Sequence, residues 1–425
     1  MNDYFFDIKI LNELVSRRSE PGWVKDARNA ALTQFVNQPW PGIRDEEWRR
    51  TNISHINFQS YEILNGYKDA GKSEPVDELP GKSGLAEFRG HQCISAKIRK
   101  SLDDRGVIFT TLSDAMNRHA ALVQRYLPAQ KEDGKFESLN KSLWTHGAFL
   151  YVPAFAEISE PFLLSFHEAG AKSASFPNVM VILEKGARAE LRTDISSEVG
   201  QEIFRNALVH LYVEDGAALK YFEFQNLNDA SLNFSNNHAR VARDGEIQSV
   251  VINTGSALSK TNFRCELQGP GANAHVNGIY FANHNQHFDL RTVQHHEAPQ
   301  AASNLLYKGV VKDRAHTIYQ GMIKVFPDAQ QTDAYQSNKN LVLDDHARAD
   351  SIPGLEIQAN DVKCSHGSTT GRVNDDEIFY LMSRGISLDE ARKMIISGFF
   401  EDVILKLPAD LQDAVREQLE TKLES

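Results

Sequence analysis

The sequence predicts a mainly β protein in which a solenoid of stacked strands lies between two helical ends. Helical spacing of apolar residues marks roughly the first forty positions, disappears between residues 142 and 373, and returns after residue 371. In the central region, short β-rich runs are separated by Gly, Asn and Asp. These runs recur as a unit of strand, tight turn and strand, which is typical of a repeat architecture.

The N-terminal region, residues 1–135, is expected to form a mainly helical domain. Its first apolar residues stand at helical spacing: Phe5, Ile8, Leu11 and Leu14. A second amphipathic segment covers residues 24–35. The polar, glycine-rich stretch 66–84 predicts an exposed loop. A short strand over 106–111 and a helix over 114–126, with Ser113 as its N-cap, complete the region.

The core, residues 136–373, is where the solenoid is expected. The turn glycines Gly186, Gly216 and Gly245 follow one another at intervals of 30 and 29 residues. A single strand–turn–strand unit has no closed core, so each unit must bury its apolar face against the next. A propeller or a large sandwich would also meet this requirement. Single Gly-Ala and Asp-Gly corners, without the blade motifs of propellers, favour the solenoid.

The C-terminal region, residues 374–425, is expected to form a small helical domain. Asn374 is the predicted N-cap of its first helix, which ends at Gly385. Ser387 opens a second helix through a capping box. A final amphipathic helix is predicted over residues 409–423, where leucine and valine recur every four residues.

Composition excludes several classes of protein. Of the 425 residues, 41% are apolar and 24% are charged, which rules out wholesale disorder. The net charge of −11 at pH 7 repels phosphate backbones and anionic lipids, so neither nucleic acid nor membrane is an expected partner. Three widely spaced cysteines suit reduced thiols, and no uncharged apolar run approaches the ~20 residues of a membrane span. With no basic and apolar leader at its start, the chain is expected to be soluble and cytoplasmic.

The segment Gly66–Ser73 matches the phosphate-binding pattern GxxxxGK[ST] at every position. A P-loop requires a helix directly after its Gly-Lys-Ser, because the amides of that helix cradle the phosphates. Residues 74–81 instead contain two prolines, three acids and a glycine. The match is therefore interpreted as a coincidence in a loop and not as a nucleotide site.

Several histidines fall in one stretch of the predicted solenoid: His275, His284, His287, His295 and His296. Imidazole is a common metal ligand, and successive turns could bring these rings together. The spacing matches no compact ligand motif, so structural roles at solvated corners are the favoured interpretation. Asp289 is placed to orient one of the rings.

The segment Asp361–Gly371 carries Cys364 and His366 two residues apart. In a strand these side chains face the same way and can meet one ligand or one partner surface. Lys363 is expected to lower the pKa of the thiol if it lies close to it. A buried cysteine and a hydrogen-bonded histidine remain an equally good interpretation of the spacing. A Cys-His hydrolase is disfavoured, because this geometry rarely lets the histidine act as base to the cysteine.

At this segment the chain resembles a known family. The matching segments are Asn340–Leu343, Pro353–Ile357, Asp361–Gly367 and Phe379–Ile386, with support from 46–51, 139–153 and 329–336. They resemble the SufB/SufD family, the scaffold of Suf iron–sulfur cluster assembly, over nearly the whole chain. The Cys-Ser-His-Gly form and the length are closer to SufD-type members, and the proposed cluster-building cysteine of SufB has no evident counterpart here.

The resemblance implies a right-handed parallel β-helix and a non-catalytic scaffold subunit. Such a subunit pairs with SufB through the β-helix and binds SufC, an ABC-type ATPase, through its C-terminal helices. The residues implied for SufC binding are Phe379, Tyr380, Arg384, Gly385, Phe399 and Phe400. His366 is the implied iron ligand or proton acceptor at the interface with SufB, and Cys364 is its companion.

The resemblance further implies that the chain alone holds no stable cofactor and that iron or a nascent cluster lies at the interface with SufB. A homodimer of the isolated chain stays open. Two alternatives also remain. A β-helix enzyme acting on polysaccharide would need clustered carboxylates, for which Asp344, Asp345 and Asp350 are the only grouping. A structural solenoid without ligand would need no partner.

Overall fold

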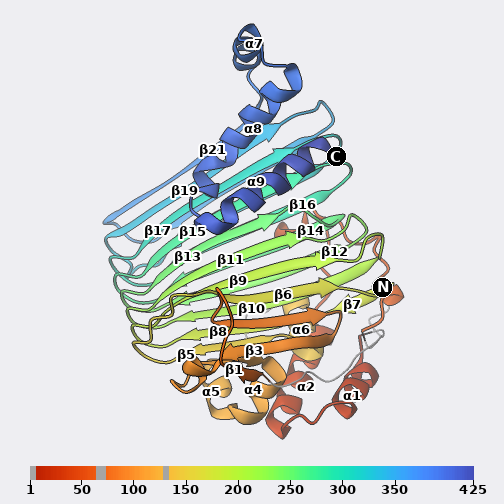
Figure 1. Cartoon of the computed structure of the whole chain (residues 1–425), viewed down its shortest axis with the longest axis vertical. Helices are drawn as coiled ribbons and strands as arrows, with labels where there is room; N and C mark the ends of the chain where they lie inside the picture. The colour runs from red at the N-terminus through yellow and green to blue at the C-terminus, as the bar shows by residue number, and fades with distance from the viewer. Residues whose placement is uncertain (1–5, 64–72, 128–133) are drawn as a thin grey trace.

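The computed structural model describes residues 6–63, 73–127 and 134–425, which form a parallel β-solenoid with helices at both ends (Figure 1). Within these residues the strands make two sheets. Sheet A has ten strands, nine of them in the order β20-β18-β16-β14-β12-β10-β8-β5-β4 and the tenth, β7, beside β10. Sheet B has eleven strands in the order β1-β3-β2-β6-β9-β11-β13-β15-β17-β19-β21. Along most of the solenoid the chain alternates between the sheets. The predicted solenoid is confirmed.

The N-terminal region contributes both helices and strands. Its elements are α1 (Ile8–Ser16), α2 (Gly22–Asn37), the 3₁₀ turns η1 (Glu46–Trp48) and η2 (Phe58–Ser60), β1 (Glu74–Val76), β2 (Gly84–Arg89), β3 (Gln92–Arg99), α3 (Lys100–Asp103), β4 (Ile108–Thr111), α4 (Leu112–Arg118), α5 (Ala120–Tyr126) and α6 (Lys135–Leu143).

The solenoid strands follow. Those of sheet A are β5 (Ala148–Val152), β8 (Asn178–Leu183), β10 (Ile203–Val213), β12 (Leu232–Val241), β14 (Leu258–Leu267), β16 (His287–His296), β18 (His316–Val325) and β20 (Arg348–Ile357), with the short β7 (Ser173–Ser175) beside β10. Those of sheet B are β6 (Phe162–Glu168), β9 (Arg188–Ser197), β11 (Ala218–Asn226), β13 (Glu246–Asn253), β15 (Asn273–Ala282), β17 (Ala302–Val311), β19 (Thr332–Val342) and β21 (Val362–Arg372).

The corners of the solenoid require a backbone that most residues avoid. Gly186 and Gly216 adopt φ of +68° and +66° at equivalent corners, and Asp244 takes φ +52° just before Gly245. Glycine, and less often Asp or Asn, tolerates this left-handed conformation. The recurring turn in the sequence therefore marks one row of corners, as predicted.

The N-terminal region differs from expectation in three places. The helix predicted over 114–126 is broken at His119 into α4 and α5. Its N-cap is Thr111 and not Ser113, because the Thr111 hydroxyl accepts a hydrogen bond from the Asp114 N–H at 3.2 Å. The antiparallel β2–β3 hairpin lies where no strand was predicted, and β2 extends sheet B by pairing with β6.

The P-loop-like segment falls largely outside the described residues, at 66–72. The chain that follows Ser73 forms strand β1, Glu74–Val76. The expectation that no helix starts there is confirmed.

The boundary predicted at residue 135 separates segments that share both sheets. β2 pairs with β6, β4 pairs with β5, and α6 runs across the boundary. The three-domain division stays a prediction. No described helix is both long enough and apolar enough to cross a lipid bilayer.

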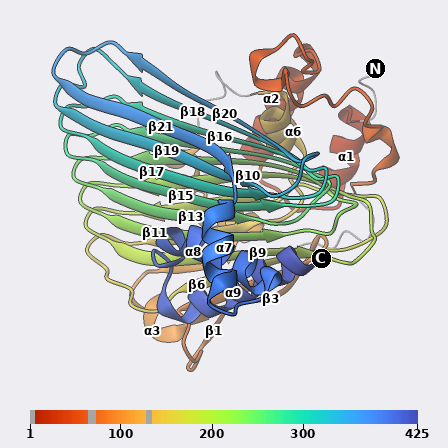
Figure 2. The same cartoon turned by 90° about the horizontal axis from the view of Figure 1, so that it is seen from above.

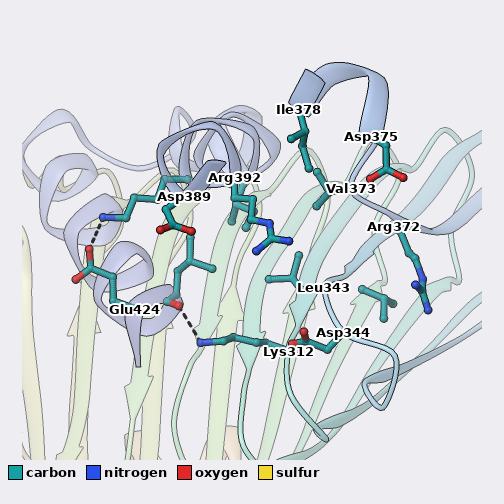
Figure 3. A pocket seen from close by; sticks show the side chains of 14 residues that line it. Lys312, Leu343, Asp344, Arg372, Val373, Asp375, Ile378, Asp389, Arg392 and Glu424 are labelled. Atoms are coloured by element: carbon teal, nitrogen blue, oxygen red, sulfur yellow. Dashed lines mark hydrogen bonds and ion pairs between the residues drawn. The ribbon is translucent and has the colours of Figure 1, made fainter. Parts of the chain in front are cut away.

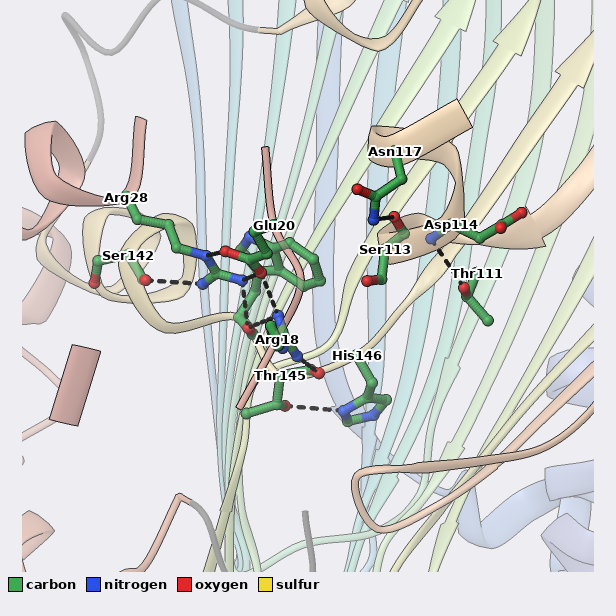
Figure 4. Close-up of polar contacts among 11 residues, drawn as sticks. Arg18, Glu20, Arg28, Thr111, Ser113, Asp114, Asn117, Ser142, Thr145 and His146 are labelled. Atoms are coloured by element: carbon green, nitrogen blue, oxygen red, sulfur yellow. Dashed lines mark hydrogen bonds and ion pairs between the residues drawn. The ribbon is translucent and has the colours of Figure 1, made fainter. Parts of the chain in front are cut away.

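A buried ion cluster fastens the N-terminal helices to the first turns (Figure 4). The Glu20 carboxylate accepts from Arg18 at 3.0 Å and from Arg28 at 2.8 Å, and all three side chains are buried. The guanidinium groups also donate to the carbonyls of Ser142 and Trp144. Burial acts to raise the pKa of Glu20, but the two guanidinium groups outweigh it and hold the pKa below its ordinary value.

The C-terminal helices are α7 (Asp375–Ser383), α8 (Leu388–Ile404) and α9 (Ala409–Glu424). The predicted caps are confirmed, since the Asn374 and Ser387 side chains accept from N–H groups of the first turns of α7 and α8. α8 and α9 pack on sheet B, on the side opposite α1 and α2, while α7 projects past the last turns (Figures 1 and 2).

Candidate functional site

The last turn of the solenoid leaves one edge of each sheet uncovered. Within the described residues, β20 pairs only with β18 and β21 only with β19. Neither strand contains a buried residue. Unpaired backbone N–H and C=O groups at such edges are a template for another chain. This end, formed by β20 and β21 and here called the open end, is the candidate interaction surface.

Cys364 and His366 both lie on β21 at the open end. Alternation along the strand puts them on one face, and the register places them beside Ala334 and Gln336 of β19. Cys364 is half-buried against the apolar cluster of the last turns, whereas His366 is exposed. No hydrogen bond or ion pair from the described residues engages the His366 ring. The structure therefore presents an accessible imidazole next to a thiol.

The electrostatics of Cys364 correct one expectation. Burial, together with the Asp333 carboxylate, raises the pKa of the thiol, although a backbone hydrogen bond with Ala334 opposes the shift. Lys363 is not among the causes of this shift, because neighbouring residues of a strand point to opposite faces, so the closeness that its expected effect required is absent. Without a metal, Cys364 is a protonated thiol near neutral pH.

Gln336, beneath His366, is a residue that sequence reasoning missed as part of the site. Its side chain is fully buried, and neither amide atom has a hydrogen-bond partner among the described residues. Burying an unpaired polar group costs about 1–3 kcal/mol. The signal in the sequence is the alternation along β19, which puts Ala334 and Gln336 on one inward face.

The residues predicted to bind an ATPase lie in two different places, some on α7 and some on α8. Phe379 and Tyr380 on α7 are 73% and 56% exposed, and no residue of α7 is buried. The Arg384 guanidinium stacks on the Tyr380 ring at 5.2 Å, beside the exposed Gly385. These four residues form a contiguous amphipathic surface, here called the α7 surface.

Phe399 and Phe400 lie on α8 and face the solenoid. Phe400 is fully buried in the cluster between α8 and sheet B, and Phe399 is half-buried. The Phe399 carbonyl accepts from the Lys308 ammonium at 2.6 Å, and that ammonium also pairs with Asp402 at 2.5 Å. In this chain Phe400 holds α8 in place, so it is not part of the accessible surface.

A cavity of about 680 Å³ separates the C-terminal helices from the last turns (Figure 3). Its walls carry both signs of charge: Lys312, Arg372, Arg392 and Lys393 together with Asp344, Asp375, Asp389 and Glu424. Lys312 bridges the gap by donating to the Leu423 carbonyl at 2.9 Å. The mixed charge selects neither anions nor cations, and the cavity sets α7 apart from the solenoid.

The five clustered histidines do not converge. His284 is at a corner, where its N–H donates to the Asp313 carboxylate at 2.8 Å. His287 lies 3.1 Å from the Thr51 hydroxyl, which in turn donates to Asp289.

The other three histidines lie on different faces. His275 contacts Asn273 on sheet B, and His296 faces inward 2.8 Å from the Ser303 hydroxyl. His295 lies on the outer face of sheet A. Burial lowers the pKa of both His287 and His296 to about 4.

The acids suggested for a polysaccharide enzyme are all engaged in structural contacts. Asp344 accepts from the Asp313 N–H at 2.7 Å, and Asp345 pairs with Arg372 at 2.5 Å. Asp350 lies on β20 and pairs with Arg348 at 2.9 Å. Contacts within the solenoid thus account for all three carboxylates.

The sequence that carries this geometry matches a known protein family. The family model described as SUF system FeS cluster assembly, SufBD core domain, matches residues 166–399, more than half of the chain. The chain belongs to the SufBD family. The match runs from β6 to α8 and includes Cys364, His366 and the α7 surface.

Relatives over nearly the full length carry the same family name. An iron-sulfur cluster assembly SufBD family protein of Staphylococcus saprophyticus is 26% identical over 425 residues, covering 94% of this chain and 89% of the relative. One from Staphylococcus aureus strain USA300 is 26% identical over 423 residues with the same coverage. The SufBD family assignment places this chain in iron–sulfur cluster assembly, and the polysaccharide alternative is not favoured.

Proposed function

We propose that this chain is a SufD-type scaffold subunit that pairs with a SufB-type partner through the open end and carries no catalytic turnover of its own. One observation supports this most directly. The last strand, β21, bears Cys364 and His366 and has a bare edge. A partner strand docked there would come to lie beside both side chains.

The partner would complete the solenoid. Paired backbone groups would supply affinity, and alternate side chains would supply specificity, as in other cases of strand addition. The isolated chain has the same edges available to a second copy, so a homodimer would compete with the heterodimer. Iron–sulfur assembly then takes place at the shared interface, with iron or a nascent cluster as cargo.

His366 would act at that interface as an imidazole ligand or proton acceptor. Imidazole and thiolate are both ligands that iron accepts. Because the pKa of Cys364 is raised, its thiol would bind metal only by releasing its proton, and metal binding drives that release. His366 is accessible to receive such a proton.

The α7 surface would dock the SufC-type ATPase. Two exposed aromatic side chains and a stacked guanidinium form the kind of anchor that dominates protein interfaces. Since α7 packs on no other element through a buried residue, a partner can cover it without unfolding the chain.

The decisive experiment co-expresses the chain with SufB and SufC from the same source and purifies through a tag on this chain. We expect recovery of all three subunits, with iron–sulfur absorbance lost in His366→Ala and kept in His284→Ala, a matched histidine at a corner. Retention of neither SufB nor SufC would refute the proposed scaffold role of this chain. Survival of both complex and cluster in His366→Ala would refute only the role of His366.

A second experiment tests the α7 surface. Phe379→Asp is expected to reduce SufC capture at least tenfold, while Val199→Asp, an even more exposed apolar position far from α7, leaves it unchanged. Circular dichroism confirms that both variants fold. Equal capture by the two variants would exclude α7 as the docking surface.

A further inference from the structure

Three side chains with metal-binding atoms meet on the outer face of sheet A. Glu266 on β14, His295 on β16 and Glu297 just after β16 each offer one ligand atom, and these atoms all lie within 4.8 Å of one another. The group lies well before the last turn and on a different sheet from Cys364 and His366. Neither the proposed interface nor the α7 surface includes it.

The register of the solenoid creates this arrangement. Glu266 and His295 are direct neighbours across β14 and β16. Glu297 lies two residues beyond His295, and its N–H donates to the Leu267 carbonyl at 3.0 Å, which continues the ladder past the end of the strand. Residues two apart on an extended chain face the same way. The backbone pairing thus fixes the positions of all three residues relative to one another.

Neighbouring side chains orient the three groups. Arg240 donates to Oε2 of Glu266 at 3.0 Å. Gln268 donates from Nε2 to Oε2 of both Glu266 and Glu297, at 3.4 and 3.2 Å. These contacts are all to Oε2 atoms, and Oε1 of Glu297 is 3.9 Å from Nδ1 of His295. Hydrogen bonds to ligating carboxylates are typical of metal sites.

The Phe326 ring packs edge-on against the His295 ring, with 5.6 Å between the ring centroids. The three side chains are partly accessible, with exposed fractions of 15%, 18% and 31% for Glu266, His295 and Glu297. An ion can therefore reach the group from solvent and keep water in its remaining positions.

We propose that Glu266, His295 and Glu297 bind a divalent first-row transition metal ion. One imidazole and two carboxylates suit Fe²⁺, Mn²⁺, Co²⁺ or Zn²⁺, whereas Mg²⁺ and Ca²⁺ prefer oxygen ligands alone. A cation between the two carboxylates also offsets their mutual repulsion. The binding needs neither SufB nor SufC.

The test is a Co²⁺ titration of the tag-free full chain after chelator treatment, in a Cys364→Ser/His366→Ala background that removes the open-end ligands. We expect about one equivalent of Co²⁺ to bind with d–d absorption bands. His295→Ala and Glu297→Gln should each weaken binding at least tenfold. Glu356→Gln, on the same face but paired with Lys324 at 2.9 Å, should bind as the parent does.

The outcomes are distinguishable. Absence of Co²⁺ binding in the parent, or unchanged affinity in both His295→Ala and Glu297→Gln, would overturn the proposal. Loss of binding in Glu356→Gln as well would show diffuse attraction to acidic surface instead of a site. Because the background lacks Cys364 and His366, none of these results depends on the role proposed for the open end.

Discussion

The two ends of the solenoid are built from the same kind of stacked strands but differ in how far these strands are buried. Near the N-terminal end, every residue of β8 and β10 is buried, under helices α4 and α6 and an aromatic cluster. At the open end, β20 and β21 contain no buried residue. A solenoid turn is stable only against a neighbour. The chain supplies that neighbour itself at the N-terminal end, whereas at the open end no strand of the described residues covers β20 and β21.

The largest effect is expected in the covered end. Phe204 on β10 is fully buried and touches four aromatic rings of the N-terminal segments: Phe6, Phe58, Tyr61 and Phe136. Phe204→Ala should lower the free energy of unfolding by about 3–5 kcal/mol, because it leaves a cavity. Urea unfolding monitored by circular dichroism measures this. A loss below about 1 kcal/mol would mean that the cap contributes little to the first turns.

The second effect concerns the ion cluster of the covered end. Glu20→Gln leaves Arg18 and Arg28 buried without their counter-charge and should cost about 3 kcal/mol at neutral pH. The folded pKa of Glu20 lies below its ordinary value of 4.5, so its contribution is fully present above pH 4.5 and is lost as the pH falls through the folded pKa. The difference between wild type and variant should therefore shrink in acid.

That difference, and not the wild-type curve, is the quantity to measure. Burial lowers the pKa of His91, His287 and His296 to about 4, so these histidines already remove stability as the pH falls from 6.5 towards 4. They act equally in Glu20→Gln. A difference that stays constant down to pH 3 would contradict the role given to Glu20.

A smaller effect is expected where α8 meets the solenoid. Lys308→Met removes the ammonium that binds the Phe399 carbonyl and Asp402, and should cost about 1–2 kcal/mol. Proteolysis within α7 and α8 should quicken while the strand core stays resistant. Unchanged proteolysis would show that the apolar contacts of Phe400 alone hold the helix.

The smallest effect is expected at the open end. Ile357 on β20 is 42% exposed, and Ile357→Ala should change stability by less than about 1 kcal/mol in the isolated chain. Hydrogen exchange sharpens the comparison, because amides of β20 and β21 should exchange faster than those of β8 and β10. Addition of the SufB-type partner should slow exchange at the open end only. Equal protection of both ends without a partner would remove the distinction.

Much of this fold can be predicted from local sequence patterns. The turn at Gly186 and Gly216 repeats because a left-handed corner recurs, and the caps Asn374 and Ser387 mark helix starts directly. The β2–β3 hairpin was missed because its inward positions are few and include small residues such as Ala86 and Ala96. Weak alternation of this kind becomes a strand only through its pairing with β6.

The residues of the candidate sites also fall into two groups: those that local sequence patterns bring together, and those that only the pairing of strands brings together. Cys364 and His366 are two residues apart, so their shared face follows from strand geometry alone. Gln336 joins them only through the pairing of β19 with β21, and Glu266 joins His295 only through that of β14 with β16. The number of residues in one turn varies along the solenoid. Val241 pairs with Leu267, 26 positions further on, whereas Val325 pairs with Ile357, 32 positions further on. Contacts between turns therefore cannot be read from a fixed repeat length.

The seat of α8 and α9 on sheet B has a mechanical consequence. Their apolar faces contact β11, β13, β15 and β17 together, through residues such as Phe222, Val250, Ile279 and Val310. A force applied to α7 is therefore distributed as shear over four successive strands, and the last strand is not pulled away from the sheet on its own. A partner that pulled on α7 would thus load these four strands together and not the strands of the open end alone.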